Sequence, residues 1–284
     1  MAIPKKVAER LVAGIKKFQP VIANAKARDV NESDTVMLAT DLLADVFGYG
    51  KYDEVTSEYA IKSTYCDLAI KLDGVLQLLI EVKAIGLELK DAHVKQAVDY
   101  AANQGAQWVV LTNAEIWRVF NVTLAKSVEA EQVLEINFSA LNPKSESDLE
   151  LLYTLSKEGW QKSALGAFHE QKQALSRFSV AAIVQSEAVV NVIRKELRAQ
   201  APDIRIEPEQ ILDVLRQEVL KRDVIEGEKA DAAKKKVARV AKQKAARKAK
   251  DEDDGEEAAV VAPAPTEPPA AARRVSAPPP GPAS

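Results

Sequence analysis

The chain has 284 residues, a net charge of −3 and a single cysteine, Cys66. One cysteine excludes an internal disulfide and a cysteine-based zinc site, and it fits a reducing compartment. No apolar run approaches the roughly 20 residues that span a bilayer, and the opening residues lack the apolar stretch of a signal peptide. We therefore expect a soluble, cytoplasmic protein with no membrane contact.

Two predicted helices open the chain, over residues 5–28 and 33–47, and the second ends at Gly48 and Gly50. Alternating apolar residues then predict three strands, a helix that closes at Gly105, and three more strands. This order predicts an α/β fold with a mixed sheet flanked by helices. The strands are expected at 55–62, 67–71, 75–83, 107–112, 116–122 and 132–138, and the intervening helix at 88–103.

Residues 147–227 follow a helical pattern throughout, which predicts an appendage of three or four helices. This appendage is a candidate surface for a second copy or a partner protein. We expect an N-terminal helix over 1–30, an α/β domain over 31–140 and a helical domain over 147–227.

Beyond Gly227 large apolar residues nearly vanish, so this part cannot bury enough surface to form a compact domain. A basic, Ala/Lys-rich helix or arm is expected over 228–250, followed by a disordered acidic and Pro/Ala-rich tail over 251–284. The basic run favours salt-sensitive affinity for nucleic acid. A solvated single helix is the alternative.

The turn between the second and third predicted strands decides which side chains share a face. If residues 72–74 form a three-residue loop with the glycine in the left-handed conformation, Lys71 pairs with Val75. Asp67 then faces Leu79. Side chains repeat every second residue on one face of a strand, so this register separates an apolar face from a charged one.

In that register Asp67 and Glu81 are diagonal neighbours, close enough to bind one cation, and Lys83 lies beside them. A two-residue turn at 73–74 would instead put the two carboxylates on opposite faces. A hard ion such as Mg²⁺ takes carboxylate oxygens, with the Val82 carbonyl as a further ligand. The residues predicted on the charged face are Asp67, Ala69, Lys71, Gln77, Leu79, Glu81 and Lys83.

Asp67, followed by Glu81-Val82-Lys83 at the end of an apolar strand, resembles the catalytic signature of the PD-(D/E)xK nuclease superfamily. More narrowly, residues 31 to about 122 resemble the N-terminal nuclease domain of type I restriction enzyme R subunits, and the fold implied is restriction-endonuclease-like. The residues that carry this narrower resemblance are Asn31, Glu32, Thr35, the stretch from Leu43 to Tyr49, Glu58, Tyr59, Gln107, Trp108, Leu111, Thr112, Asn113 and Trp117. Gln96 and Tyr100 match the QxxxY element that many nucleases of the superfamily carry after the lysine.

The resemblance implies an endo- or exonuclease, dependent on Mg²⁺ or Mn²⁺, that cuts nucleic acid in restriction, defence or repair. DNA is favoured as the substrate, and RNA is the alternative. Asp67 and Glu81 would be metal ligands, Glu32 an auxiliary acidic residue near the metal, and Lys83 the catalytic lysine. Gln96 and Tyr100, four residues apart on one helix face, would position substrate or water.

Two departures from the family pattern matter. Cys66 stands where the motif has proline, and no GxxxxGK[ST] phosphate loop is present, so the helicase motor of a complete R subunit is missing. The alternative function is a catalytically inactive module that binds nucleic acid or supports assembly on a nuclease fold. Asp73 is expected in a turn, His169 and His93 in structural roles, and Trp108 and Trp117 in the core.

Overall fold

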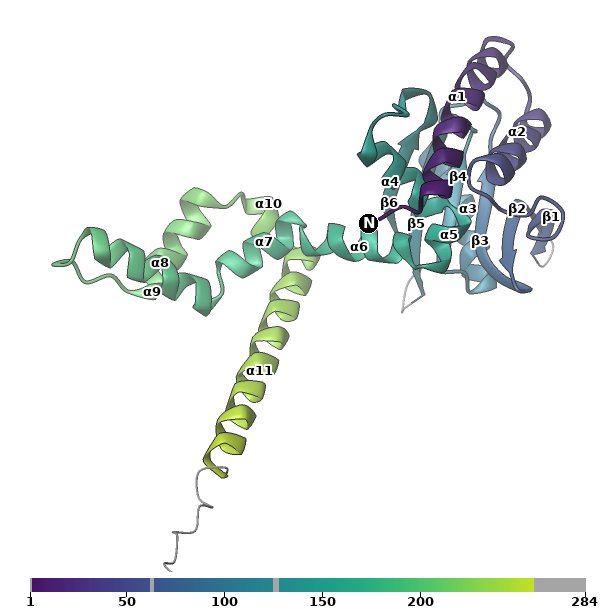
Figure 1. Cartoon of the computed structure of the whole chain (residues 1–284). Coiled ribbons are helices and arrows are strands. Elements are labelled where there is room, and N and C mark those ends of the chain that lie inside the picture. Colours follow the sequence, from purple (N-terminus) through teal and green to yellow (C-terminus); the bar gives the residue numbers. More distant parts are fainter. Residues whose placement is uncertain (1, 62–63, 125–127, 258–284) are drawn as a thin grey trace, which may run out of the picture. The chain divides into compact units, whose positions relative to one another are not determined.

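The computed structural model describes residues 2–61, 64–124 and 128–257 (Figure 1). The chain divides into two compact units, Met1–Ser176 and Arg177–Ser284. Residues 258–284, most of the segment predicted as a disordered tail, lie outside the described residues. No helix in the described part of the chain is long and apolar enough to cross a membrane.

Six strands within the described residues of the first unit form one sheet, ordered in space as they are in sequence. β3 and β4 are parallel, and every other neighbouring pair is antiparallel. A parallel pair needs a crossover, which helix α3 (Asp91–Gln104) supplies. The strands are β1 (Val55–Ile61), β2 (Thr64–Leu72), β3 (Val75–Val82), β4 (Trp108–Thr112), β5 (Ile116–Leu124) and β6 (Val128–Asn137).

Helices cover both faces of this sheet, which confirms the predicted α/β class. α1 (Lys5–Ala27) and α2 (Glu32–Asp45) pack on one face, where Leu68, Ile80 and Val82 point into the larger core. α3 packs on the other face, over Ala69 and Leu79. Both faces of the central strands are therefore apolar along most of their length, as expected for strands next to a parallel crossover.

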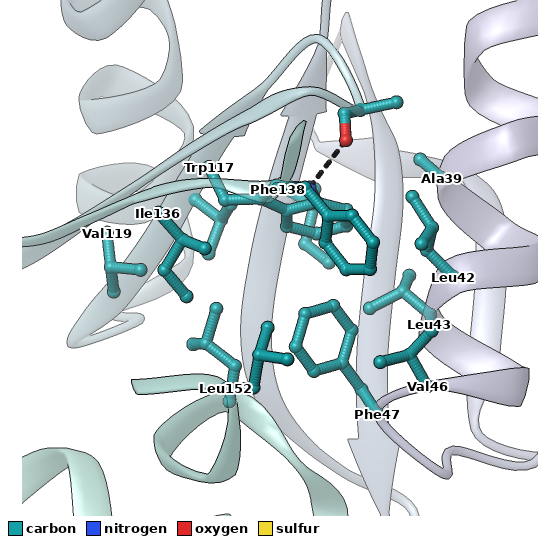
Figure 2. Packing of buried hydrophobic residues seen from close by; sticks show 14 of the residues in the cluster. Ala39, Leu42, Leu43, Val46, Phe47, Trp117, Val119, Ile136, Phe138 and Leu152 are labelled. Carbon is teal, nitrogen blue, oxygen red and sulfur yellow. Dashed lines mark hydrogen bonds between the residues drawn. The ribbon is translucent and has the colours of Figure 1, made fainter. Parts of the chain in front are cut away.

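The larger core joins segments that are distant in sequence. Phe47, just after α2, packs edge-to-face on Trp117 of β5, with ring centroids 5.2 Å apart. Figure 2 shows Phe47 and Phe138 between Leu42 and Leu43 of α2 on one side and Val119 and Ile136 of the sheet on the other. The Trp117 indole N–H donates to a backbone carbonyl at 2.9 Å, so this buried ring leaves no unpaired polar atom. The predicted core position of Trp117 is confirmed.

A short 3₁₀ helix, η1 (Phe138–Ala140), and three further helices complete the first unit. They are α4 (Glu146–Leu155), α5 (Lys157–Gln161) and α6 (Ala164–Ala174). Leu152 and Leu165 are buried in the core shared with α1 and α2. The first part of the 147–227 segment thus contributes to the sheet unit.

The β2–β3 hairpin closes through a two-residue turn. Leu72 pairs with Val75, and only Asp73 and Gly74 lie between them. Both have positive φ, 51° and 77°, the combination of a type I′ turn. The expected three-residue loop is therefore wrong, although Gly74 is left-handed and Asp73 is a turn residue, as predicted.

A β-bulge farther along the hairpin changes the register again. It lies next to the Ile70/Lys71 step of β2, and Gln77 is the extra residue of β3. The Gln77 side chain accepts a hydrogen bond of 3.0 Å from the indole N–H of Trp160, which packs against the larger core. Gln77 therefore does not lie on the charged face where the sequence placed it.

Beyond the bulge Leu68 pairs with Ile80. Continuing this register by one residue sets Asp67 across from Glu81. The predicted pairing of Asp67 with Leu79 is wrong by two residues, because the one-residue change in the turn and the one-residue bulge add. Two one-residue changes restore the original face, so Asp67 and Glu81 still share one side of the sheet.

The second unit consists of helices in its described part. Val190, Ile211 and Leu215 form its small apolar cluster. The helices are α7 (Arg177–Val184), α8 (Glu187–Gln200), α9 (Pro208–Val214), the π-helical η2 (Leu215–Val219), α10 (Arg222–Ile225) and α11 (Glu228–Glu257). α11 includes the acidic residues 251–257, which the sequence assigned to the tail.

Gly74→Val tests the turn. The variant is expected to lose about 1–2 kcal/mol of unfolding free energy, because a β-branched residue is strained at positive φ while an added Cβ meets no atom within 4 Å. Urea denaturation measures the loss. Gly166→Ala is the matched control: it also has open space around the added Cβ but lies in α6, where alanine should be neutral or stabilising. Equal stability of Gly74→Val and wild type would contradict the assigned turn.

Candidate functional site

Asp67, Glu81 and Lys83 meet at the C-terminal end of β3. The Lys83 Nζ lies 2.7 Å from Glu81 Oε1. The Val82 backbone N–H donates to Asp67 Oδ2 at 2.7 Å. Because the β2–β3 ladder ends here, the Asp67 carboxylate accepts the hydrogen bond that a backbone carbonyl would accept in a continued ladder. The structure thus brings the three predicted residues together on one face.

Hydrogen bonds to neighbouring elements hold this end of β3. The Lys83 backbone N–H donates to the Thr112 carbonyl of β4 at 2.8 Å. Two residues later the Ile85 N–H donates to Thr35 Oγ1 of α2 at 3.1 Å. Asn113 Nδ2 donates to the Ile85 carbonyl at 3.3 Å. Thr35 and Asn113 are buried polar residues that the sequence analysis did not assign to the site, and they position it indirectly.

Glu32 lies at the rim of this group. Asn31 caps α2 by accepting the Asp34 N–H at 2.9 Å, which makes Glu32 the first residue of the helix. Glu32 Oε2 is 3.9 Å from Lys83 Nζ, and the Glu32 side chain is 46% exposed. Its charge also raises the pKa of Glu81, so the structure places it within electrostatic range of the carboxylates.

Burial dominates the electrostatics of the two inner carboxyls. Glu81 is 2% exposed, and burial, assisted by the nearby Asp67 charge, raises its pKa to about 7 against the effect of the Lys83 hydrogen bond. Burial also raises the pKa of Asp67, against the hydrogen bond from Val82. Burial disfavours the Lys83 ammonium, but the hydrogen bond to Glu81 and the negative charges of Glu81, Glu32 and Asp67 together outweigh it, so the pKa of Lys83 is raised.

One oxygen of this group has no partner. Glu81 Oε2 is buried and accepts no hydrogen bond among the described residues. A buried carboxylate oxygen beside a second carboxylate fits a hard divalent cation, which replaces the missing donor and removes the like-charge repulsion. The described residues contain no group of three His, Cys, Asp or Glu side chains arranged for a metal. Asp67 and Glu81 are the residues that could hold such an ion, since Mg²⁺ takes one or two carboxylates from a protein and keeps several waters.

Gln96 and Tyr100 lie on one face of α3, as their spacing predicts. Gln96 Nε2 donates to Tyr100 Oη at 3.0 Å, and Tyr100 packs against the core that contains Leu79. The structure shows no hydrogen bond from this pair to Asp67 or Glu81, both of them described residues. The pair lies on the helix that covers the face of these carboxylates.

Both histidines have local partners. His93 Nδ1 accepts the Lys90 N–H at 3.3 Å and so caps α3. The sequence offered no partner for His169, yet its Nε2 is 3.0 Å from Glu131 Oε2 and its ring packs edge-on against Trp108. These contacts account for both rings without a role at the site.

Cys66 precedes Asp67 and is fully buried. Burial raises the pKa of its thiol to about 12, so at neutral pH it is an unreactive thiol. Its substitution for the motif's proline adds no nucleophile to the site.

Residues 40–136 match the family model described as type I restriction enzyme R protein N terminus. This range runs from the second half of α2 into β6 and contains Asp67, Glu81, Lys83, Gln96 and Tyr100. No curated protein and no solved structure matches the chain. Over this range, about a third of the chain, the protein is similar to the nuclease-like N-terminal domain of these restriction enzymes, and Glu32 lies outside the match.

The raised pKa of Glu81 predicts a pH-dependent stability in buffer without divalent ions. The folded state holds the Glu81 proton up to about pH 7 and the unfolded chain only to about 4.5, so unfolding free energy falls as pH rises through this window. The loss is on the order of 3 kcal/mol at most. Glu81→Gln has no proton to release there, so its decline should be shallower, with a residual slope from Asp67.

Urea denaturation in EDTA at several pH values between about 5 and 8 measures the two slopes. The pH slopes are compared rather than the absolute unfolding free energies, because Glu81→Gln also alters the Lys83 ion pair at every pH. Parallel declines in wild type and Glu81→Gln would contradict the assignment.

Proposed function

We propose that this domain, related to the N terminus of type I restriction enzyme R proteins, is a Mg²⁺-dependent nuclease that hydrolyses DNA phosphodiester bonds. The observation that carries the proposal is the convergence of Asp67, Glu81 and Lys83, with one buried Glu81 oxygen left without a partner. The match to residues 40–136 supports a nuclease-like domain.

Asp67 and Glu81 would hold the ion, with the Val82 carbonyl as a further oxygen and Glu32 as an auxiliary acidic residue near it. When bound, Mg²⁺ supplies positive charge that polarises the phosphoryl group and eases deprotonation of a water; Mn²⁺ can substitute. Glu81 contributes an oxygen that is already desolvated and turned inward, because it is 2% exposed. When this Glu81 oxygen binds the ion, no bulk water has to be removed from it.

Lys83 supplies a fixed cation beside the carboxylates. Its ammonium is held 2.7 Å from Glu81 and is 11% exposed. Negative charge develops on the phosphate oxygens as water attacks, and a preorganised ammonium stabilises that charge without reorganising. The raised pKa of Lys83 keeps it protonated at neutral pH.

Residues around this centre have supporting roles in the proposal. Glu32, at the exposed rim, is 3.9 Å from Lys83 and adjusts the charge of the site. Gln96 and Tyr100, joined by their own hydrogen bond, position substrate or water from α3. Asn113 and Thr35 act indirectly, because they hold the segment after Lys83.

The prediction is that Asp67→Asn, Glu81→Gln and Lys83→Ala each lower Mg²⁺-dependent DNA cleavage by about a hundredfold or more, since each removes charge at the reacting phosphate. The assay uses full-length protein with a circular plasmid, which reports internal cuts, and an end-labelled linear duplex, which reports cuts from ends. Asp73→Asn is the matched control, because Asp73 is an exposed carboxylate in the same hairpin and asparagine tolerates its positive φ.

Unchanged cleavage in Asp67→Asn or Lys83→Ala would overturn the proposal. One observation favours the inactive alternative: the Lys83 ammonium already forms a close ion pair with Glu81, and so supplies positive charge beside this carboxylate without a metal ion. A wild type that binds DNA but cleaves neither substrate with Mg²⁺ or Mn²⁺ would establish that alternative.

A further inference from the structure

α11 carries the largest excess of positive charge in the second unit. Nine lysine and arginine residues lie between Asp231 and Asp251, and no acidic residue is among them. Alanine fills most other positions, which makes the segment strongly helix-forming. The charge run is therefore presented on a regular helix (Figure 1).

One face of α11 is already occupied. Ala230 and Ala233 are 2% and 9% exposed, and Val237 is half-buried on the same side. They pack on α7, where Ala181 and Ala182 are also buried. Small side chains on both helices permit this close approach, and the packing fixes the rotation of α11 about its axis.

The opposite face carries a basic stripe, which we define as Lys235, Arg239 and Lys242. Their spacing of i, i+4 and i+7 aligns them along the helix, about 180° from the packed alanines. All three are exposed, and within the described residues none has an ion pair. The neighbouring Lys234, by contrast, is 3.6 Å from Asp231 and donates to the Ile225 carbonyl.

We propose that the basic stripe binds the phosphate backbone of duplex DNA without reading its sequence. This inference rests on the proposed function, since it gives the nuclease a second, electrostatic contact with its substrate. The stripe extends about 10 Å along the helix axis. Over that length duplex DNA presents about six phosphate charges. Unpaired lysine and arginine side chains are the groups that release counterions when they bind such a surface.

A membrane surface fits the stripe less well. An interfacial helix inserts large apolar side chains opposite its basic face. α11 contains no Leu, Ile, Phe, Trp, Tyr or Met, and its apolar side is packed on α7. The acidic residues 251–257 follow in the sequence; they would lower the affinity for DNA but not its dependence on the stripe.

The test is a binding measurement in EDTA, so that cleavage does not enter. Full-length wild type and Lys235→Ala/Arg239→Ala/Lys242→Ala are titrated into a short fluorescent duplex between about 50 and 200 mM KCl. We expect the variant to bind about tenfold or more weakly. The slope of log affinity against log salt should decrease by about 2.7, from about 0.9 per lost phosphate contact.

Lys195→Ala/Arg198→Ala/Lys221→Ala is the matched control, with the same change of charge at exposed positions of the same unit. Circular dichroism verifies that both triple variants keep their helix. The inference is overturned if the control weakens binding as much as the stripe variant, if wild type does not bind DNA, or if the stripe variant loses only binding to anionic lipid vesicles. Stripe-dependent binding by a wild type that cuts no DNA would instead overturn the proposed function alone.

Discussion

The extra residue in β3, Gln77, determines which face of the sheet carries Glu81. The I′ turn at Asp73-Gly74 alone would direct Asp67 and Glu81 to opposite sides. The bulge exchanges the faces to which the side chains after Gln77 point, and Trp160 stabilises it by donating a hydrogen bond to the Gln77 side chain. Every later feature of the site depends on this reversal, because the side-chain period of a strand is two.

The bulge also creates an electrostatic problem. It places Asp67 and Glu81 together under α3, where burial opposes ionisation of both carboxyls. Lys83 offsets part of that cost through its bond to Glu81, while Glu81 Oε2 is left without a donor. Such incomplete satisfaction is uncommon in a stable core and is typical of a site that binds an additional charged group.

The second unit is stabilised less by apolar burial than the first. Its apolar cluster is small, and the long helix α11 is held to α7 by alanines over its first turns only. Intrinsic propensity rather than burial maintains the rest of α11. Such a helix leaves Lys235, Arg239 and Lys242 exposed to solvent, whereas Glu81 and Lys83 of the first unit are buried and held by their ion pair.

Much of the first unit follows from the sequence alone. The α/β class and the order of helices and strands could be predicted, because apolar periodicity and glycine positions report burial directly. Asp67, Glu81 and Lys83 could be picked out as candidates because their residue types and order suit the proposed chemistry. The helical character of 147–227 and the basic run were equally visible in composition.

Only the tertiary structure decided the register. A bulge depends on a distant partner, here Trp160, which no local pattern around Gln77 reveals. The same holds for Thr35 and Asn113, whose buried polar groups find partners far along the chain. The sequence determined which side chains could act together. Long-range packing decided the face on which they lie, the depth of their burial and the partners that they contact, because all three depend on contacts between segments distant in sequence.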